Sequence, residues 1–223
     1  RDFGADRMVV LAAVRRNGLA LEHAASELKA DPEVALAAIR QNGLALQYAS
    51  LHLRNSAEVV LQAVRRDGTA LRFVSLELRA NVEVVLAAVR QNGIALEHAK
   101  QELRAHRDVA VAAVQQHKRA IELVVPKLRA DRDFILAAVQ RNGLVLQDAS
   151  QALRANPEVA LAAVRQNGLA LQFAAQDLRK DLRIVLAAAR QDASSLRFAA
   201  AKLEGTERDL AAATLAGTER DLA

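Results

Sequence analysis

Two features of the sequence predict an all-α fold, arranged as an α-solenoid of eight 25-residue helix-turn-helix repeats. The first is composition: apolar residues make up 52% of the chain, carried by alanine, leucine and valine, and aromatic residues only 3%. This balance suits close-packed helices better than sheets. The second is a strict period, because ADPEVALAAIRQNGLALQYAS at 30–50 returns at 155–175 as ANPEVALAAVRQNGLALQFAA.

The period of 25 residues holds without insertion or deletion, and eight full copies fit between residues 6 and 205. Fixed periodicity of this kind indicates a solenoid, in which each repeat buries its apolar face against its neighbours. Beyond the array, LEGTERDLA at 203–211 is followed by LAGTERDLA at 215–223. We therefore expect a repeat array at 1–205 and a short helical cap or tail at 206–223.

Each repeat is expected to open with an α-helix. Its first position is nearly always a residue that can accept hydrogen bonds from the free amides of a helix start. Pro32 and Pro157 then occupy the first helical position, where a missing amide costs nothing. A buried apolar side, including Leu86, is expected to follow. The capping column is Asp6, Asp31, Ser56, Asn81, His106, Asp131, Asn156, Asp181 and Thr206.

The first helix is expected to end at an Asn-Gly pair, such as Asn42-Gly43, with the glycine in the left-handed conformation. A hairpin turn between strands is the alternative for this pair, and the helical spacing of the flanking apolar residues argues against it. Leu46, Ala49 and Leu53 then predict a second helix, which closes on Arg54. Helices of about ten residues are marginal alone, so stacking must stabilise them.

A column of alanines lies in the middle of the first helices, where small side chains allow close approach between neighbouring repeats. Its members are Ala13, Ala38, Ala63, Ala88, Ala113, Ala138, Ala163 and Ala188.

The fifth repeat, 106–130, departs from the pattern at two places. His117-Lys118 replaces Asn-Gly, and a left-handed lysine would cost about 1 kcal/mol or more. Pro126 is expected inside the second helix, where it would stop or kink the helix near Val125 at a cost of about 3 kcal/mol. Restoring the consensus is therefore expected to stabilise the array. Two interpretations stay open: drift in a redundant array, or a bend carrying a basic patch for an acidic partner, formed by His117, Lys118, Arg119 and Lys127.

The phrase VVLAAVRQNGxALxxAxxxLRxD, clearest at 84–104 and 159–179, resembles the repeats of the family catalogued as domain of unknown function 4116. The unit of that family corresponds to about two of the present periods, and the resemblance covers nearly all of 6–205. It implies a helical repeat array, similar to those multiplied in protists, algae and some bacterial effector proteins. It implies no particular activity.

No pattern in the sequence points to catalysis. Cysteine is absent, the five histidines lack metal-ligand spacing, and there is no phosphate-binding glycine loop or nucleophile elbow. We therefore predict no enzyme, cofactor, metal site or small-molecule substrate. Apolar runs such as FILAAV at 134–139 are too short to span a membrane. The compartment expected by default is intracellular, in the cytoplasm or an organelle, and the start at Arg1 indicates a fragment or a processed product.

Arginines recur at the ends of both helices of the repeat, and the net charge is +5. The structural interpretation is that they complement helix C-termini and pair with acids at the next helix start. The functional interpretation is a ladder that grips the phosphates of RNA or DNA. The first column is Arg40, Arg65, Arg90, Arg165 and Arg190, and the second is Arg54, Arg79, Arg104, Arg129, Arg154 and Arg179.

One further column varies while its neighbours stay constant, at every 25th residue from 23 to 198. Aromatic side chains at repeated spacing suit a partner-binding groove, although a half-buried edge would vary in the same way. We expect a non-catalytic scaffold for protein-protein interaction, including the role of an accessory or structural subunit of a larger assembly; the alternative is an RNA- or DNA-binding array. The column members predicted to bind the partner are Tyr48, Phe73, His98, Phe173 and Phe198.

Overall fold

The computed structural model describes residues 3–199, and every regular element within that range is a helix. The chain divides into two compact units, Arg1–Val124 and Val125–Ala223. We call them the N-terminal and C-terminal units and describe each by itself. Within the described range no helix is long and apolar enough to cross a membrane. The predicted cap at 206–223 lies outside the described residues.

Each of the first four repeats contains a long α-helix, a six-residue 3-10 helix and a short connecting helix, and the part of the fifth repeat that belongs to the N-terminal unit contains the first two of these. The long helices are α1 (Arg7–Arg16), α3 (Pro32–Gln41), α5 (Ala57–Arg66), α6 (Val82–Gln91) and α8 (Arg107–Gln116). The 3-10 helices are η2 (Gly18–His23), η3 (Gly43–Tyr48), η4 (Gly68–Phe73), η6 (Gly93–His98) and η7 (Lys118–Leu123). The connecting helices are α2 (Ser26–Lys29), α4 (Leu51–Arg54), η5 (Leu78–Ala80) and α7 (Gln101–Arg104), and η1 (Phe3–Ala5) precedes them all.

The C-terminal unit repeats the same plan. Its long helices are α10 (Arg132–Val139), α12 (Pro157–Gln166) and α13 (Leu182–Gln191). Its 3-10 helices are η8 (Gly143–Asp148), η9 (Gly168–Phe173) and η11 (Ala193–Phe198), and its connecting helices are α9 (Pro126–Arg129), α11 (Gln151–Arg154) and η10 (Leu178–Lys180). The all-α fold and the tandem repeat are therefore confirmed.

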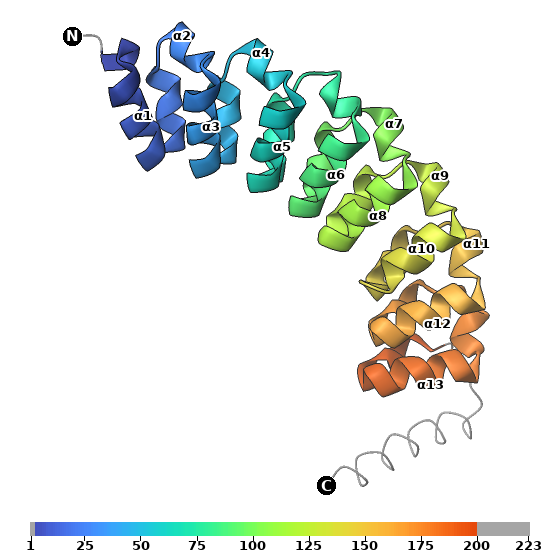
Figure 1. Cartoon of the computed structure of the whole chain (residues 1–223). Helices are drawn as coiled ribbons and strands as arrows, with labels where there is room; N and C mark the ends of the chain where they lie inside the picture. Colours follow the sequence, from blue (N-terminus) through green and yellow to red (C-terminus); the bar gives the residue numbers. More distant parts are fainter. Residues whose placement is uncertain (1–2, 200–223) are drawn as a thin grey trace, which may run out of the picture. The chain divides into compact units, whose positions relative to one another are not determined.

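Within the N-terminal unit, the long helices form one layer and the 3-10 helices form a second (Figure 1). Each long helix packs on the 3-10 helix of its own repeat and, from α3 onward, also on that of the repeat before it; α3, for example, contacts both η2 and η3. Val34, Ala38 and Ile39 of α3 are fully buried, as is Leu46 of η3. Burying a side chain of this size stabilises the fold by about 1.5–3 kcal/mol, so stacking holds the array together.

The predicted starts of the long helices are mostly confirmed. The side chain of Asp31 accepts hydrogen bonds from the amides of Glu33 (2.8 Å) and Val34 (3.3 Å), and Pro32 is the first residue of α3. Asp6, Asn81, Asp131, Asn156 and Asp181 cap in the same manner. Ser56 and His106 occupy the position without a side-chain capping bond.

The predicted second helix is wrong in detail, because it is two short elements separated by extended backbone. In the second repeat η3 ends at Tyr48, Ala49 and Ser50 are extended, and α4 begins at Leu51. The amide of Ser50 donates to the carbonyl of Lys29 in the preceding repeat at 3.0 Å. An unbroken helix would use that amide internally, so the break supplies a backbone link between repeats. The same link joins Ser75 to Arg54 and Lys100 to Arg79.

The predicted left-handed glycine is also wrong, since no described glycine has a positive φ. Asn42 is extended (φ −147°), and its side chain accepts a hydrogen bond from the Leu44 amide at 3.0 Å, so it caps the 3-10 helix. Gly43 is required for a different reason. A Cβ at this residue would lie 2.6 Å from the carbonyl oxygen of Ala63 in the next repeat. Glycine thus permits close approach between repeats.

The alanine column lies at this approach. The members from Ala38 to Ala188 are all buried, whereas Ala13 is exposed in α1, the first described long helix. The glycine amide adds a polar link in several repeats, as where Gly68 donates to Oε1 of Gln91 at 2.6 Å.

The fifth repeat forms the same elements as its neighbours, so both predicted strains are wrong. His117 has the extended φ of the asparagines (−145°), and its Nδ1 accepts from the Arg119 amide at 3.3 Å. Lys118 is not left-handed, because no described residue has a positive φ. Pro126 is the first residue of α9, where an amide is not needed. The helix does break before Pro126, but the same break occurs in the other repeats.

Candidate binding face

The long helices carry a regular exposed stripe on the side away from the 3-10 layer. In α3 the stripe consists of Glu33, Leu36, Ala37 and Arg40, which follow one another at the spacing of a single helix face. Glu33 and Arg40 are exposed, and Leu36 and Ala37 are half-buried. We call this side of each unit the long-helix face. In α3, α6 and α12 it presents an acidic border, an apolar strip and a basic border.

Hollows lie between successive helices on this face. One of about 440 Å³ lies between α1 and α3, and one of about 460 Å³ lies between α5 and α6. In the C-terminal unit a hollow of about 630 Å³ lies between α12 and α13. All three have a leucine and an alanine in the lining, and an arginine from each of two successive helices. The first is lined by Arg15, Glu33, Leu36, Ala37, Arg40 and Gln41.

The expectation that Leu86 is buried is wrong, because Leu86 lines the hollow between α5 and α6 and is half-buried. The apolar pattern of α6 extends around more of the helix than the core requires. Val84, Val85, Ala88 and Val89 form its buried side. Leu86 and Ala87 are additional apolar residues on the open side, and the pattern alone does not show which side faces the core.

The first arginine column is exposed and unpaired. Arg40, Arg65 and Arg90 lie in the last turns of α3, α5 and α6, as predicted, and Arg15 extends the row into α1. Among the described residues none of these four guanidinium groups has a hydrogen bond or an ion pair, so the expected pairing with acids is absent. Gln115 of α8 ends the row. In the C-terminal unit Arg165 and Arg190 have the corresponding positions and are also exposed.

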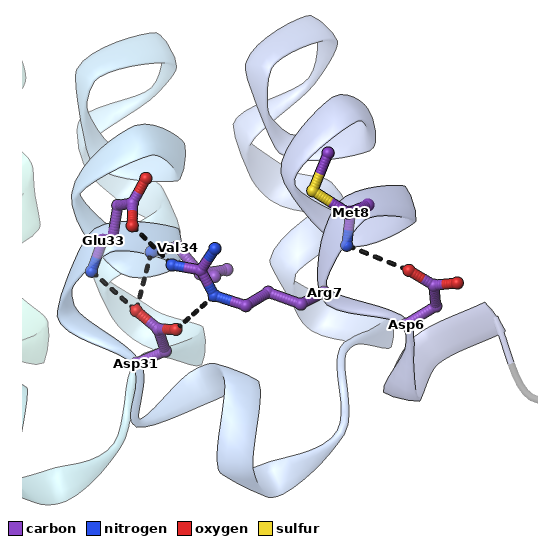
Figure 2. A network of polar contacts seen from close by, with 6 residues as sticks. All are labelled: Asp6, Arg7, Met8, Asp31, Glu33 and Val34. Atoms are coloured by element: carbon purple, nitrogen blue, oxygen red, sulfur yellow. Dashed lines mark hydrogen bonds and ion pairs between the residues drawn. The ribbon is translucent and has the colours of Figure 1, made fainter.

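Where acidic residues at the helix starts form ion pairs, their partners are not the arginines of the first column. Figure 2 shows Arg7 of α1 reaching both Asp31 (2.9 Å) and Glu33 (2.5 Å) at the start of α3. The hydrogen bond from Arg7 lowers the pKa of Asp31, and the same bond raises the pKa of Arg7. Because the folded-state pKa of Asp31 is lowered, this contribution is present at neutral pH and is lost as the pH falls below about 4. Arg132 pairs with Glu158 in the C-terminal unit.

The second arginine column supports the structural interpretation. Nε of Arg79 donates to the carbonyl of Val74 at 2.9 Å, and its guanidinium also donates to the carbonyl of Arg72. Arg104 likewise donates to the carbonyls of Ala99 (3.2 Å) and Glu97. All six arginines of this column are half-buried. Arg79 and Arg104 thus satisfy carbonyls at the end of the 3-10 helix, whereas Nε of Arg54, Arg154 and Arg179 is buried without a hydrogen-bond partner among the described residues. Half-buried guanidinium groups are poorly placed to grip phosphates.

The aromatic column lies at the last residue of each 3-10 helix. Tyr48, Phe73, His98, Phe173 and Phe198 are all half-buried. The guanidinium of Arg72 lies over the ring of Phe73 (4.5 Å), and Arg197 lies over Phe198 (4.6 Å). Burial lowers the pKa of His98, and burial together with the nearby Glu22 raises that of Tyr48. Both positions therefore contact protein atoms, and their role in partner binding stays a prediction.

The predicted basic patch of the fifth repeat is exposed. His117, Lys118 and Arg119 belong to the N-terminal unit, and Arg119 forms an ion pair with Glu122 at 3.9 Å. Lys127 is exposed on α9 of the C-terminal unit. Within residues 3–199 no group of three metal-binding side chains is brought together.

The apolar strip, Leu36 and Ala37 with their equivalents, was not among the predicted site residues. Its signal is present in the sequence, because a leucine and an alanine lie between Glu33 and Arg40 in α3, and the same arrangement recurs between Glu83 and Arg90 in α6. The pattern becomes informative only when the buried side of the helix is known.

Comparison with curated proteins and with solved structures found no match for the chain. Comparison with family models found four consecutive matches, at residues 6–54, 56–104, 106–154 and 156–203. Each match spans about two of the 25-residue repeats, as the resemblance implied. Together they cover most of the sequence, and the chain therefore belongs to the family described as Domain of unknown function (DUF4116).

Proposed function

We propose that the chain is a non-catalytic repeat scaffold that binds another protein on its long-helix face. The observation that carries this proposal is the recurrence of similarly lined hollows in both units, between α1 and α3, α5 and α6, and α12 and α13. Protein interfaces commonly combine an apolar centre with a polar rim in which arginine is frequent. The leucine and alanine of each hollow, bordered by arginines, provide that combination.

The chemistry of the hollows supports binding rather than catalysis. A catalytic site needs convergent titratable groups, one of which is a nucleophile, acid or base near the reacting atom. In the hollow between α5 and α6 the charged groups are Arg65, Glu83 and Arg90. All three are exposed, so none of them lies in the apolar surroundings that usually prepare a catalytic acid or base.

Nucleic acid is the second candidate, favoured by the exposed row of Arg15, Arg40, Arg65 and Arg90. Two observations weigh against it. The exposed carboxylates of Glu58 and Glu83 lie on the same helices as the arginines. Single-stranded nucleic acids are commonly held by stacking on aromatic side chains, and the aromatic residue of the described long helices, Phe134, is fully buried.

The test is capture of partners from the native source with the full chain, with and without nuclease, compared between two double variants. Ala37→Gln with Ala87→Gln fills two hollows, and the fold should tolerate it because Gln62 has the equivalent place in α5. Ala80→Gln with Ala105→Gln makes the same change at exposed positions elsewhere. We expect only the first variant to lose the partner, and nuclease to change nothing. Nuclease-sensitive capture that both variants retain would contradict the proposal.

A further inference from the structure

The N-terminal unit combines an arginine row and apolar hollows on one face, and from this we infer the chemistry of the partner. We propose that the face binds an extended acidic segment of another protein, with a carboxylate at about every third residue. This inference rests on the proposed function and specifies what that function recognises. The described residues that carry it are Arg15, Arg40, Arg65 and Arg90. Beside them lie the hollow between α1 and α3, lined by Leu36, and the hollow between α5 and α6, lined by Leu86.

Charge complementarity is the first argument. Arg40, Arg65 and Arg90 lie at equivalent places in three successive helices, are exposed, and have no carboxylate partner among the described residues. The chain does pair arginine with carboxylate elsewhere, as at Arg7 with Asp31 and Glu33. The row is therefore a set of aligned, unneutralised cations, which attracts a partner with carboxylates along one edge.

Spacing is the second argument. Packed helices lie about 8–10 Å apart, so successive arginines of the row are separated by roughly that distance. A polyproline II segment has three residues per turn and advances about 3.1 Å per residue. Every third side chain of such a segment therefore lies on the same side, with a separation of about 9 Å. An acidic residue at every third position would meet one arginine in each repeat.

The apolar strip supplies the third argument. A hollow lies beside Leu36 and Ala37, and an equivalent one beside Leu86 and Ala87. A segment with three residues per turn has three rows of side chains. With the carboxylate row at the arginines, one of the other two rows can face the strip, where apolar groups can enter the hollows. Gln62 lies at the equivalent position of α5, so a polar side chain is accommodated between them.

The acidic border fixes how the segment lies across the face. Glu58 and Glu83 are exposed near the starts of α5 and α6, whereas Arg65 and Arg90 lie in the last turns of the same helices. The carboxylates of the segment are repelled at the first border and attracted at the second. The segment therefore runs across the helices on the arginine side of the strip.

The test is fluorescence anisotropy with the full chain and four labelled probes. The first is a 15-residue peptide of repeated Glu-Leu-Pro, which favours polyproline II. The second has the same composition with its glutamates in one block, and the third is a helical peptide with Glu at every seventh residue. The fourth is a single-stranded oligonucleotide. We expect the first to bind tightest and to weaken as salt is raised. Tighter binding of any other probe would overturn the extended acidic occupant.

Two triple variants locate the site. Arg40→Gln, Arg65→Gln and Arg90→Gln together remove three positive charges from the row, and Lys100→Gln, Arg141→Gln and Lys180→Gln remove three from exposed positions off the long helices and outside the basic patch of the fifth repeat. We expect the row variant to bind the first peptide roughly tenfold more weakly, because exposed ion pairs contribute modestly and add along the row. The control should change little. Equal losses would overturn the assignment to the row.

The two proposals can fail separately. If none of the peptides binds, but partner capture is still lost in the Ala37→Gln and Ala87→Gln variant, the acidic segment is the wrong occupant and the long-helix face remains the binding surface. If capture is unaffected by that variant as well, the proposed function itself fails. Circular dichroism of each variant shows whether the fold is retained. We expect it to be, since all substituted arginines are exposed.

Discussion

The fourth repeat (residues 81–105) and the fifth (106–130) have different residues at the joints but the same elements. Asn92-Gly93 in the fourth corresponds to His117-Lys118 in the fifth, and Gln101 corresponds to Pro126. Nevertheless α6 and α8 both have ten residues, η6 and η7 have six, and α7 and α9 have four. The backbone of the repeat therefore does not depend on glycine at the joint.

The comparison of these two joints shows why glycine occurs at most of them. Histidine and lysine can adopt the extended and 3-10 backbone angles of this joint as readily as asparagine and glycine. A Cβ on Gly93, however, would lie closer than 3.0 Å to the carbonyl oxygen of Ala113 in the next repeat. The glycine serves stacking, and local conformation is set by the capping residue before it. The division between the two compact units falls after Val124, in one of the two repeats that lack this glycine; the other is the eighth, which has Ala193.

The largest expected effects test whether the cores of the two repeats are equivalent. Leu96 of η6 is fully buried and Ile121 of η7 is 3% exposed. Leu96→Ala and Ile121→Ala should each destabilise the chain by about 2–5 kcal/mol, because each removes buried methyl groups and leaves a cavity. Urea denaturation of the full chain measures both. Leu86→Ala is the comparison: it is half-buried and should cost less than either, and an equal cost would place Leu86 in the core.

The next effect tests the role of the glycine directly. Gly93→Ala should destabilise by about 1–3 kcal/mol, since the added Cβ meets backbone that cannot move freely. Lys118→Ala is the matched change in the fifth repeat, where the residue already has a Cβ and is exposed. It should alter stability by less than about 0.5 kcal/mol. Similar changes in both variants would refute the stacking role and return the glycine to a purely local one.

Much of the fold was predictable because each position of the repeat occurs several times in the sequence, so a local pattern can be checked in several copies. The long helices, their caps at residues such as Asp31 and Asn156, and the alanine column follow from local rules that apply in any context. The 3-10 helices were not predictable in this manner. Leu46, Ala49 and Leu53 fit an α-helix as well, and the break after Tyr48 depends on a hydrogen bond from Ser50 to the preceding repeat.

The candidate site was predictable only in part. The arginine column at Arg40, Arg65 and Arg90 was recognised, but its pairing with acids was expected from closeness in sequence. In the folded chain Glu33 pairs instead with Arg7, a residue of the preceding repeat. Which charges neutralise each other depends on how repeats stack, and so does the side of α6 on which Leu86 lies.

A smaller effect concerns the start of α8. Asn81 accepts a hydrogen bond from the Val84 amide at 3.1 Å, whereas His106 makes no capping bond and its Nδ1 is buried without a partner among the described residues. His106→Asn should therefore stabilise the chain by about 1 kcal/mol. Asn81→Ala should lose a similar amount in the fourth repeat. A rise in the urea midpoint for the first variant and a fall for the second would agree with this account; no rise would mean that His106 is already satisfied.

The smallest effect concerns Pro126. Its direction is opposite to the gain in stability that comparison with the other repeats predicts for replacing this proline. If the proline lay inside a helix, Pro126→Gln would stabilise the fifth repeat. Because Pro126 is the first residue of α9, its ring breaks no hydrogen bond there, and it restricts the unfolded chain. Pro126→Gln should therefore destabilise by about 0.4–1 kcal/mol.

The reciprocal change is Gln101→Pro at the first position of α7, where the preceding Lys100 is extended (φ −60°, ψ 152°), as a residue before proline prefers. It should stabilise by a similar amount in urea denaturation. A loss of stability in Gln101→Pro together with a gain in Pro126→Gln would show that the joint between the 3-10 helix and the short helix differs in the two repeats after all.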